Sequence, residues 1–375
     1  MDALKLLSGD ARTFLDKVWA SHIHVHHTDP DDLAGLLSLD DVDHLLTSTA
    51  LRAPALRIAR DGAVLPASAF TRAATLSGQP LTGLVDGRKV LDLFNAGATV
   101  VLQGLHRYWP PLTTLVRELE LALGHPCQAN AYLTPPGSQG FAVHSDSHDV
   151  FVFQTHGTKR WEVHDDAGAR DVLLEPGVSM YLPTGTPHAA RAQDSASLHV
   201  TIGINRVTWR ELLRRVTGEL LADDRYDGPL PAGYLDDPAT LADGLAEHLR
   251  SLSEQLAAQE PAPLTDAQSA RFLSTRNPAL RGGLRDRLRI AEVDDDTTLL
   301  RRPGSACVLV PHGDRLRVLL GDREVDMPRR LSAPMQVVAD RPTLRPVDLA
   351  EWLDPASRLV LARRLVREGL LRIAD

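Results

Sequence analysis

The sequence predicts an all-β sandwich or barrel, with mixed α/β structure before it and helices after it. Within residues 126–208, short apolar β-type runs follow one another, and Gly, Pro, Asp or Ser punctuates each gap. Many short strands separated by frequent turns are typical of a β-sandwich or barrel. From residue 209 the apolar residues change to helical spacing, which marks the end of this unit. The predicted strands are Ala129–Leu133, Val150–Gln154, Arg160–Val163, Ser179–Leu182 and Leu198–Ile204.

Residues 1–125 predict a mixed α/β flank that leads into the β unit. The segment Ser38–Leu46 predicts a short helix, because its first serine can cap the exposed N–H groups of the helix start. Two apolar runs within Leu56–Leu65 surround Asp61-Gly62, a dipeptide that favours the tight turn of a β-hairpin. Apolar residues at helical spacing in Leu112–Leu123 predict another helix, which should end at Gly124.

Two amphipathic segments follow the β unit and predict helices, at Thr208–Leu221 and Ala239–Ala258. The barrel alone need not cover their apolar faces, so we expect a homodimer that forms through them. The stretch EPAPLTD at 260–266 is typical of a linker, because it concentrates proline and polar residues.

A third unit is predicted at the C-terminal end, where helices accompany small β elements and indicate a winged-helix module. A β-hairpin is expected around His312-Gly313-Asp314, then helices at Pro346–Trp352 and Pro355–Glu368 and a strand at Leu370–Ile373. Acidic residues dilute the basic ones here, so a structural or protein-contact role is expected rather than DNA binding. The chain therefore divides into residues 1–208, with a barrel core from about 95 to 208, then 209–262 and 263–375.

Composition and charge argue against a nucleic-acid-binding protein and against a membrane protein. The chain of 375 residues has a formal net charge of −8, which argues against broad contact with a nucleic-acid phosphate backbone. No apolar run approaches the roughly 20 residues of a membrane helix. No secretory signal is evident at the N-terminus either. Cys127 and Cys307 are expected to be unpaired thiols, as in a reducing compartment, so we expect a cytoplasmic protein without membrane contact.

The most informative segment, residues 130–164, contains His144-Ser145-Asp146. On a β-strand alternate side chains point to the same face, so this imidazole and carboxylate can reach one metal ion. A further histidine would complete the two-histidine, one-carboxylate triad that holds iron(II) and leaves positions open for a co-substrate and O₂.

The third ligand should come from a later strand or turn. His188 fits best, because an apolar strand ends at Pro183-Thr184-Gly185 and the chain turns back at Pro187-His188. His199 is the second choice, since it lies on a predicted strand where packing or hydrogen bonding is an alternative role. The remaining histidines of the region are expected in loops or on the surface: His148, His156 and His164.

Lys159 is one of only four lysines in a chain that otherwise uses arginine, and it begins the predicted strand 159–163. A lysine ammonium is a compact point charge that suits a carboxylate at the end of a pocket. The alternative interpretation is an ordinary lysine at a strand edge.

Several segments together resemble one known family, the JmjC-type ribosomal oxygenases. These are cupin-fold protein hydroxylases that act on arginine or histidine side chains of ribosomal proteins, and they carry a helical dimerisation segment and a winged-helix domain after the barrel. The resemblance covers nearly the whole chain. It rests on Gly97–Leu102, Asn130–Gly140, His144-Ser145-Asp146, Val150–Gln154, Gly157, Lys159-Arg160-Trp161 and Leu182–His188.

The resemblance implies a double-stranded β-helix core of the cupin/JmjC type and an iron(II)- and 2-oxoglutarate-dependent protein hydroxylase. It implies that Lys159 binds the distal carboxylate of 2-oxoglutarate. The family often places a serine near Gly203 to help hold the co-substrate, and the glycine of this chain departs from that pattern. The implied metal ligands are His144, Asp146 and His188, and the implied co-substrate pocket contains Asn130, Tyr132 and, as a weaker candidate, Thr201.

Two other functions fit the same residues. A tailoring hydroxylase of a peptide natural product would use the same chemistry and would be encoded within a biosynthetic cluster. A non-catalytic cupin sensor with a DNA-binding winged helix would form no succinate and would bind DNA in a salt-dependent way. The four histidines within residues 22–27 (HIHVHH) could bind a metal, although a strand with exposed imidazoles is the preferred interpretation.

Overall fold

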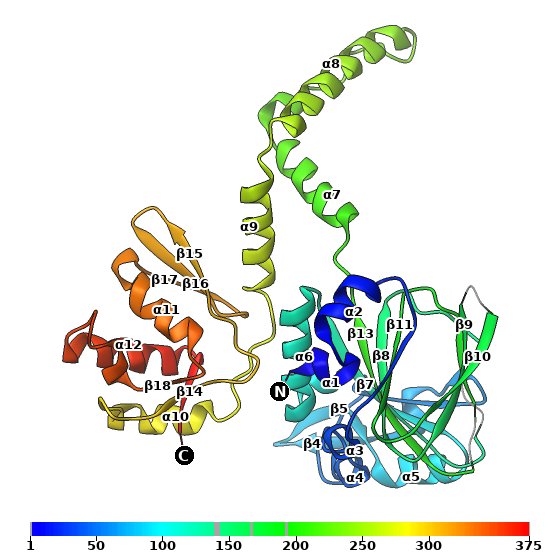
Figure 1. Cartoon of the computed structure of the whole chain (residues 1–375). Coiled ribbons are helices and arrows are strands. Elements are labelled where there is room, and N and C mark those ends of the chain that lie inside the picture. The colour runs from blue at the N-terminus through cyan, green and yellow to red at the C-terminus, as the bar shows by residue number, and fades with distance from the viewer. Residues whose placement is uncertain (1, 139–142, 166–167, 192–193, 375) are drawn as a thin grey trace.

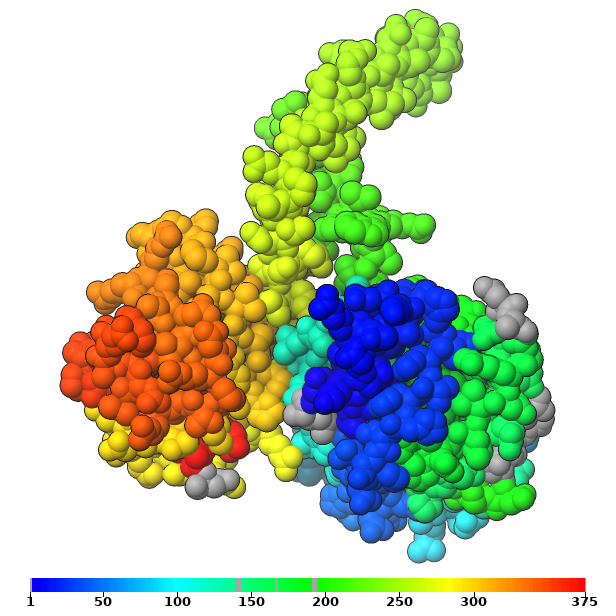
Figure 2. Space-filling model, viewed as in Figure 1, coloured from blue at the N-terminus to red at the C-terminus, as the bar shows by residue number. Residues whose placement is uncertain are grey.

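A barrel unit lies beside a second globular unit, and a helical arm projects away from both (Figures 1 and 2). The computed structural model describes residues 2–138, 143–165, 168–191 and 194–374. Within these ranges no helix is both long enough and apolar enough to cross a membrane.

Short helices and hairpins form the N-terminal flank. They are α1 Ala3–Ser8, α2 Ala11–Lys17, β1 His24–His27, α3 Pro30–Ala34, α4 Leu39–Thr47, β2 Leu56–Arg60, β3 Ala63–Val64, β4 Thr71–Leu76, β5 Gln79–Val85, α5 Gly87–Asn95, β6 Thr99–Leu102 and α6 Pro110–Leu123. The predicted cap of α4 is confirmed: the Ser38 hydroxyl accepts from the Asp41 N–H at 3.1 Å, and the Asp41 carboxylate accepts from the Ser38 N–H at 2.8 Å. The predicted hairpin turn is also confirmed, with φ angles of 52° at Asp61 and 76° at Gly62.

Two antiparallel sheets form the barrel, which confirms the predicted β-sandwich or barrel. Its later strands are β7 Cys127–Thr134, β8 Asp149–His156, β9 Lys159–Asp165, β10 Gly168–Leu174, β11 Val178–Leu182, β12 His188–Arg191 and β13 Ser197–Ile204. The larger sheet has eight strands in the order β1-β11-β8-β13-β7-β6-β2-β3, and the smaller has three in the order β10-β9-β12. All five predicted strands are present, whereas β10 and β12 were not predicted.

The two faces of the larger sheet have different roles. One face packs under the N-terminal helices and α6, with Phe151, Val200 and Ile202 in that core. The opposite face meets the smaller sheet, where Val152 and Trp161 belong to a second, smaller core. Because β13 pairs with both β7 and β8, alternate residues of three neighbouring strands point into the space between the sheets.

The arm consists of three helices, α7 Trp209–Leu220, α8 Pro238–Ala257 and α9 Pro261–Phe272. Both predicted amphipathic helices are therefore present. The prediction of a linker at 260–266 is wrong. Pro261 lies in the first turn of α9, where a proline ring fits and its missing N–H costs no hydrogen bond.

The C-terminal unit has its own apolar core, which includes Leu316, Met335 and Leu365. Its elements are α10 Gly283–Arg289, β14 Leu299–Arg301, β15 Val308–His312, β16 Arg315–Leu319, β17 Glu324–Pro328, α11 Ser332–Asp340, β18 Thr343–Leu344, α12 Pro355–Arg367 and β19 Leu371–Ile373. The predicted hairpin around His312-Gly313-Asp314 is confirmed as β15–β16, with Gly313 at φ 58°. A third strand, β17, extends this hairpin into a small sheet.

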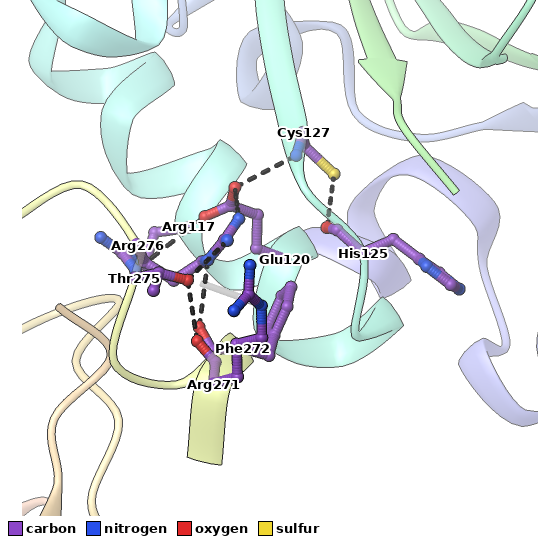
Figure 3. A network of polar contacts seen from close by, with 8 residues as sticks. All are labelled: Arg117, Glu120, His125, Cys127, Arg271, Phe272, Thr275 and Arg276. Carbon is purple, nitrogen blue, oxygen red and sulfur yellow. Dashed lines mark hydrogen bonds and ion pairs between the residues drawn. The ribbon is translucent and has the colours of Figure 1, made fainter. Parts of the chain in front are cut away.

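A buried polar network joins the barrel unit to the chain that leads into the C-terminal unit (Figure 3). Glu120 of α6 accepts hydrogen bonds from the Cys127 backbone N–H at 3.1 Å and from Arg276 Nη1 at 3.3 Å. Arg276 follows α9, and its guanidinium lies 4.4 Å from the centre of the Phe272 ring. Arg117 forms a second ion pair with Glu120 at 3.9 Å. Two guanidinium groups thus share one buried carboxylate, which offsets the cost of removing these charges from water.

Candidate metal and co-substrate site

His144, Asp146 and His188 meet at the cavity between the two sheets. One potential ligand atom from each residue lies within 4.8 Å of those from the other two. His144 and His188 form an isolated antiparallel bridge, in which each backbone N–H donates to the other carbonyl, at 3.0 and 2.8 Å. The prediction that the His-x-Asp pair lies on a strand is wrong in this detail. The strand β8 begins only at Asp149, and the bridge to His188 orients the His144 backbone instead.

The His188 imidazole is held in one orientation and one tautomer. Its Nδ1 lies 2.9 Å from the Thr186 carbonyl oxygen, which can only accept, so Nδ1 carries the proton. Nε2 therefore keeps its lone pair, and it lies 3.7 Å from an Asp146 carboxylate oxygen. Burial lowers the pKa of His188, which favours the neutral ring that a metal needs. Two imidazoles and one carboxylate on one side of an open cavity fit iron(II).

The cavity has a volume of about 770 Å³. The structure brings every predicted site residue to its wall, and their roles as ligands and co-substrate contacts stay predictions. The lining includes His144, Asp146, His188, Lys159, Asn130, Tyr132 and Thr201.

Lys159 is buried, so the interpretation as a strand-edge lysine is wrong. The side chain is only 5% exposed, and its Nζ donates to the Thr134 hydroxyl at 3.0 Å. Burial lowers the pKa of Lys159 to about 8. No carboxylate pairs with this ammonium among the described residues. A buried cation without an anionic partner on the wall of a cavity suits an anionic ligand.

Asn130, Tyr132 and Thr201 lie on the inner face of β7 and β13. The Asn130 amide oxygen accepts from the Gly104 N–H at 3.0 Å, which fixes the side chain. The Tyr132 ring stacks on His199 with 5.0 Å between ring centres. Burial raises the pKa of Tyr132, so the phenol stays protonated near neutral pH. Thr201 lies opposite Asn130 in the register of the two strands. Contacts within the protein therefore hold the Asn130 and Tyr132 side chains in place.

The other histidines do not join the metal cluster. His199, the second choice for third ligand, is 3% exposed and packs between the rings of Tyr132 and Trp161. Burial holds the pKa of His199 well below its usual range. His156 is exposed and His164 bonds to Glu162 at 2.9 Å, as predicted for surface residues.

His148 lies in the bend before β8, as predicted for a loop residue, and its side chain also lines the cavity. A Cβ atom at Gly203 would lie 2.5 Å from His148 Nε2, so the imidazole occupies the space that a side chain at position 203 would need. The glycine therefore accommodates His148. A glycine inside a strand often marks a close approach of this kind, but no local pattern indicates which residue approaches it.

Three of the four N-terminal histidines, His24, His26 and His27, lie on β1, the edge strand that pairs with β11. His24 Nε2 lies 3.0 Å from the Ser8 carbonyl oxygen, and His24 and His26 stack with 6.5 Å between ring centres. Within the described ranges, the only cluster of three metal-ligating groups is the one at the cavity. The interpretation as a strand with imidazoles at its surface is thus preferred to a second metal site.

Comparison with known proteins identifies a JmjC domain in the chain. The sequence model of the JmjC domain matches residues 112–170 and 164–212. The NO66 protein of Branchiostoma floridae, named a bifunctional lysine-specific demethylase and histidyl-hydroxylase, is 37% identical over 39% of this chain and 25% of its own length. Ribosomal oxygenase 1 of Danio rerio is 26% identical over 72% of this chain and 55% of its own length. The chain thus spans between a quarter and about half of these relatives.

Solved structures show the fold. The ribosomal oxygenase YcfD of Escherichia coli, in complex with cobalt and succinic acid, aligns over 98% of this chain and 99% of its own with a TM-score of 0.58 and 19% identity. Its complex with cobalt and 2-oxoglutarate aligns over the same shares with a TM-score of 0.56. These matches confirm the predicted cupin/JmjC fold. The chain therefore carries a JmjC domain within residues 112–212, and the solved structures show the fold in which this domain lies.

Proposed function

We propose that this protein is an iron(II)- and 2-oxoglutarate-dependent oxygenase that hydroxylates an amino-acid side chain of a protein. One observation carries the proposal. A triad of His144, Asp146 and His188 shares its cavity with Lys159, a buried cation that has no carboxylate partner among the described residues. An open metal triad and an anion site in one cavity are what this chemistry requires.

The chain's own residues supply binding, orientation and shielding. His144, Asp146 and His188 would hold iron(II), which with 2-oxoglutarate and O₂ supplies the oxidation of a substrate C–H bond. Lys159 would bind the carboxylate of 2-oxoglutarate that lies away from the metal, and its bond to Thr134 aims the ammonium. Trp161 and the stacked Tyr132–His199 pair give the pocket an enclosed wall. Such a wall limits the water around the reacting groups.

An arginine or histidine of a ribosomal protein is the proposed target. The support is the printed names of the relatives, which are ribosomal oxygenases and a histidyl-hydroxylase. The test combines two measurements. Purified protein with iron(II), ascorbate and 2-oxoglutarate should form succinate, and ribosomal proteins from a deletion strain should lack one oxygen atom on a single peptide.

The same test separates the alternatives. Succinate formation with no mass change in any ribosomal protein would favour a tailoring hydroxylase of a peptide natural product. No succinate together with salt-dependent DNA binding would favour the cupin sensor. The C-terminal unit remains a proposed winged-helix-like domain without a DNA-binding role. Both cysteines are unpaired, which supports a proposed location in the reducing cytoplasm.

The arm is the proposed dimerisation segment. Its helices expose large apolar side chains, with Trp209 79%, Leu213 56%, Leu245 54% and Leu249 57% exposed. Such a set of exposed apolar residues on neighbouring helices indicates an interface with another molecule. The arm also extends away from both globular units, where a second copy could reach it (Figures 1 and 2).

A homodimer is therefore expected in light scattering at micromolar concentration, with twice the 40.9 kDa mass of the chain. The double variant Leu245→Asp/Leu249→Asp should shift the mass to that of a monomer, because charges in an apolar interface are costly. Leu76→Asp on β4 is the matched control, since Leu76 is 67% exposed and lies outside the arm. A wild-type protein that is monomeric under these conditions contradicts the prediction.

A further inference from the structure

Asp149 is a buried carboxylate beside the metal triad that the proposed chemistry does not use. It is the first residue of β8, three positions after Asp146, and it is 0% exposed. Its Oδ1 accepts from the Thr184 N–H at 2.8 Å and from the Thr184 hydroxyl at 2.6 Å. Its Oδ2 accepts from the Tyr181 hydroxyl at 2.6 Å, and Arg206 Nε lies 3.3 Å from Oδ1. A buried carboxylate needs such partners, and here two segments supply them, residues 181–184 and Arg206.

The contact with Thr184 matters because Thr184 belongs to the turn that presents His188. In that turn, the Gly185 N–H donates to the Asp146 carbonyl at 3.0 Å. The Thr186 carbonyl then fixes the His188 imidazole at 2.9 Å. Asp149 thus holds one end of a five-residue connection, 184–188, whose other end is a metal ligand. The segment that carries Asp146 is attached to the same turn by the backbone.

The other side of the network is rigid. Tyr181 is 0% exposed, and its hydroxyl accepts from the Ala20 N–H at 2.9 Å while donating to Asp149. The Tyr181 ring packs against Phe14 and Phe151, with ring centres 5.0 and 5.1 Å away. The hydroxyl therefore has little freedom to follow the carboxylate elsewhere. Because Asp149 bonds both Tyr181 and Thr184, it ties the turn at Thr184 to this packed aromatic core.

We infer that Asp149 is a positioning residue of the metal centre. It holds the turn that carries His188 at a fixed distance from the segment that carries His144 and Asp146. The inference rests on the metal centre proposed above and adds a residue that contacts no metal. Some residues orient a metal ligand without contacting the metal, and their loss commonly weakens metal binding about 10–100-fold.

The test measures Mn(II) affinity in the full-length protein without 2-oxoglutarate, from the electron paramagnetic resonance signal of free Mn(II). Asp149→Asn keeps the shape of the side chain but removes the charge beside Arg206 and one acceptor, and it should weaken Mn(II) binding about 10–100-fold. Thr184→Val removes only the 2.6 Å hydroxyl bond and should weaken binding less. Thr184→Ser keeps that hydroxyl and should bind Mn(II) as the wild type does.

Glu120→Gln is the matched control. Glu120 is also a buried carboxylate with an arginine partner and a backbone N–H donor, but its network lies at α6, apart from the cavity (Figure 3). It should lower the thermal midpoint without changing Mn(II) affinity. This difference separates loss of a buried carboxylate in general from loss of the one that positions His188.

The Mn(II) affinities of the Asp149 and Thr184 variants decide whether Asp149 positions the metal centre. If Asp149→Asn does not fold, as judged by circular dichroism, the Thr184 pair still decides, because Val keeps the shape of Thr without the hydroxyl, whereas Ser keeps the hydroxyl without the methyl group. A folded Asp149→Asn that binds Mn(II) within about twofold of wild type overturns the inference. If Asp149→Asn is unfolded, the same result for Thr184→Val overturns it. Either result leaves the proposed metal centre intact. A wild-type protein that binds no Mn(II) overturns the proposed metal centre itself.

Discussion

Replacing Asp146 or His144 with alanine is expected to reduce the conversion of 2-oxoglutarate to succinate to background. Each residue is one of the three proposed metal ligands, whose ligand atoms lie within 4.8 Å of one another. Loss of the carboxylate also leaves the two imidazoles without the negative charge that balances a divalent cation. The metal would be held by two neutral ligands, and neither its position nor its affinity would be maintained. Succinate release in the presence of iron(II) and ascorbate measures the effect.

Two further variants make the result specific. His156→Ala removes an exposed histidine at the end of β8 and should retain wild-type turnover. His188→Ala should match His144→Ala, since both remove one imidazole from the same cluster. Full activity in either the His144 or the Asp146 variant would remove the triad assignment.

Lys159→Ala is expected to weaken 2-oxoglutarate binding about a hundredfold or more while leaving metal affinity near that of wild type. The ammonium is 5% exposed, so a carboxylate bound beside it is also shielded from water. Breaking a buried charge pair by removing one partner costs about 3–5 kcal/mol, because the other charge stays buried and unpaired. At about 1.4 kcal/mol per tenfold change in affinity, this corresponds to at least two orders of magnitude. Titration of 2-oxoglutarate against the Mn(II)-loaded proteins measures the effect.

A second substitution separates the effect of the charge of Lys159 from the effect of its size. Lys159→Arg keeps the charge and should be milder, although the wider guanidinium must fit the space next to Thr134. Lys89→Ala is the control, because Lys89 lies outside the cavity and bonds the Thr71 carbonyl at an exposed site. A Lys159→Ala affinity within about threefold of wild type would exclude Lys159 from the site and direct attention to nearby arginines such as Arg160.

Lys159 should also make the affinity for 2-oxoglutarate depend on pH. In the free protein, burial lowers the pKa of Lys159 to about 8, so the ammonium is charged below that pH. A bound carboxylate favours the charged form and raises the pKa. Binding of 2-oxoglutarate should therefore change little near neutral pH and weaken as the pH rises through about 8. The Lys159→Arg variant should lack this decline, since arginine stays protonated.

Much of the fold could be predicted because its strands and caps have strong local causes. The five predicted strands are short runs rich in apolar and aromatic residues, and Ser38, Asp61-Gly62 and Gly124 determine a cap, a turn and a helix end through their own chemistry. The strand β10 was missed because its residues are mostly exposed, so Gly168–Leu174 lacks the apolar pattern of a buried strand. The helix α9 was missed because a proline-rich start resembles a linker when the first turn of a helix is not considered.

The candidate site was predictable where its residues carry a motif and unpredictable where only packing defines them. The His-x-Asp pair and the scarcity of lysine pointed to His144, Asp146 and Lys159. No local pattern indicates that Asp149 is fully buried, because an aspartate before a strand is usually at the surface. The contact between His148 and Gly203 likewise depends on two strands meeting in three dimensions.

The network around Glu120 has a consequence for how the chain can be divided. Glu120 bonds the first residue of β7 on one side and Arg276, beyond α9, on the other. A fragment that stops before α9 would lose Arg276 and Phe272 and would open this side of α6 to water. Its carboxylate would then keep the bond from the Cys127 N–H, and its ion pair would be the longer, 3.9 Å contact with Arg117. The barrel unit therefore depends on residues at and just after the end of the arm, Phe272 and Arg276, and a fragment that ends at the barrel would lack them.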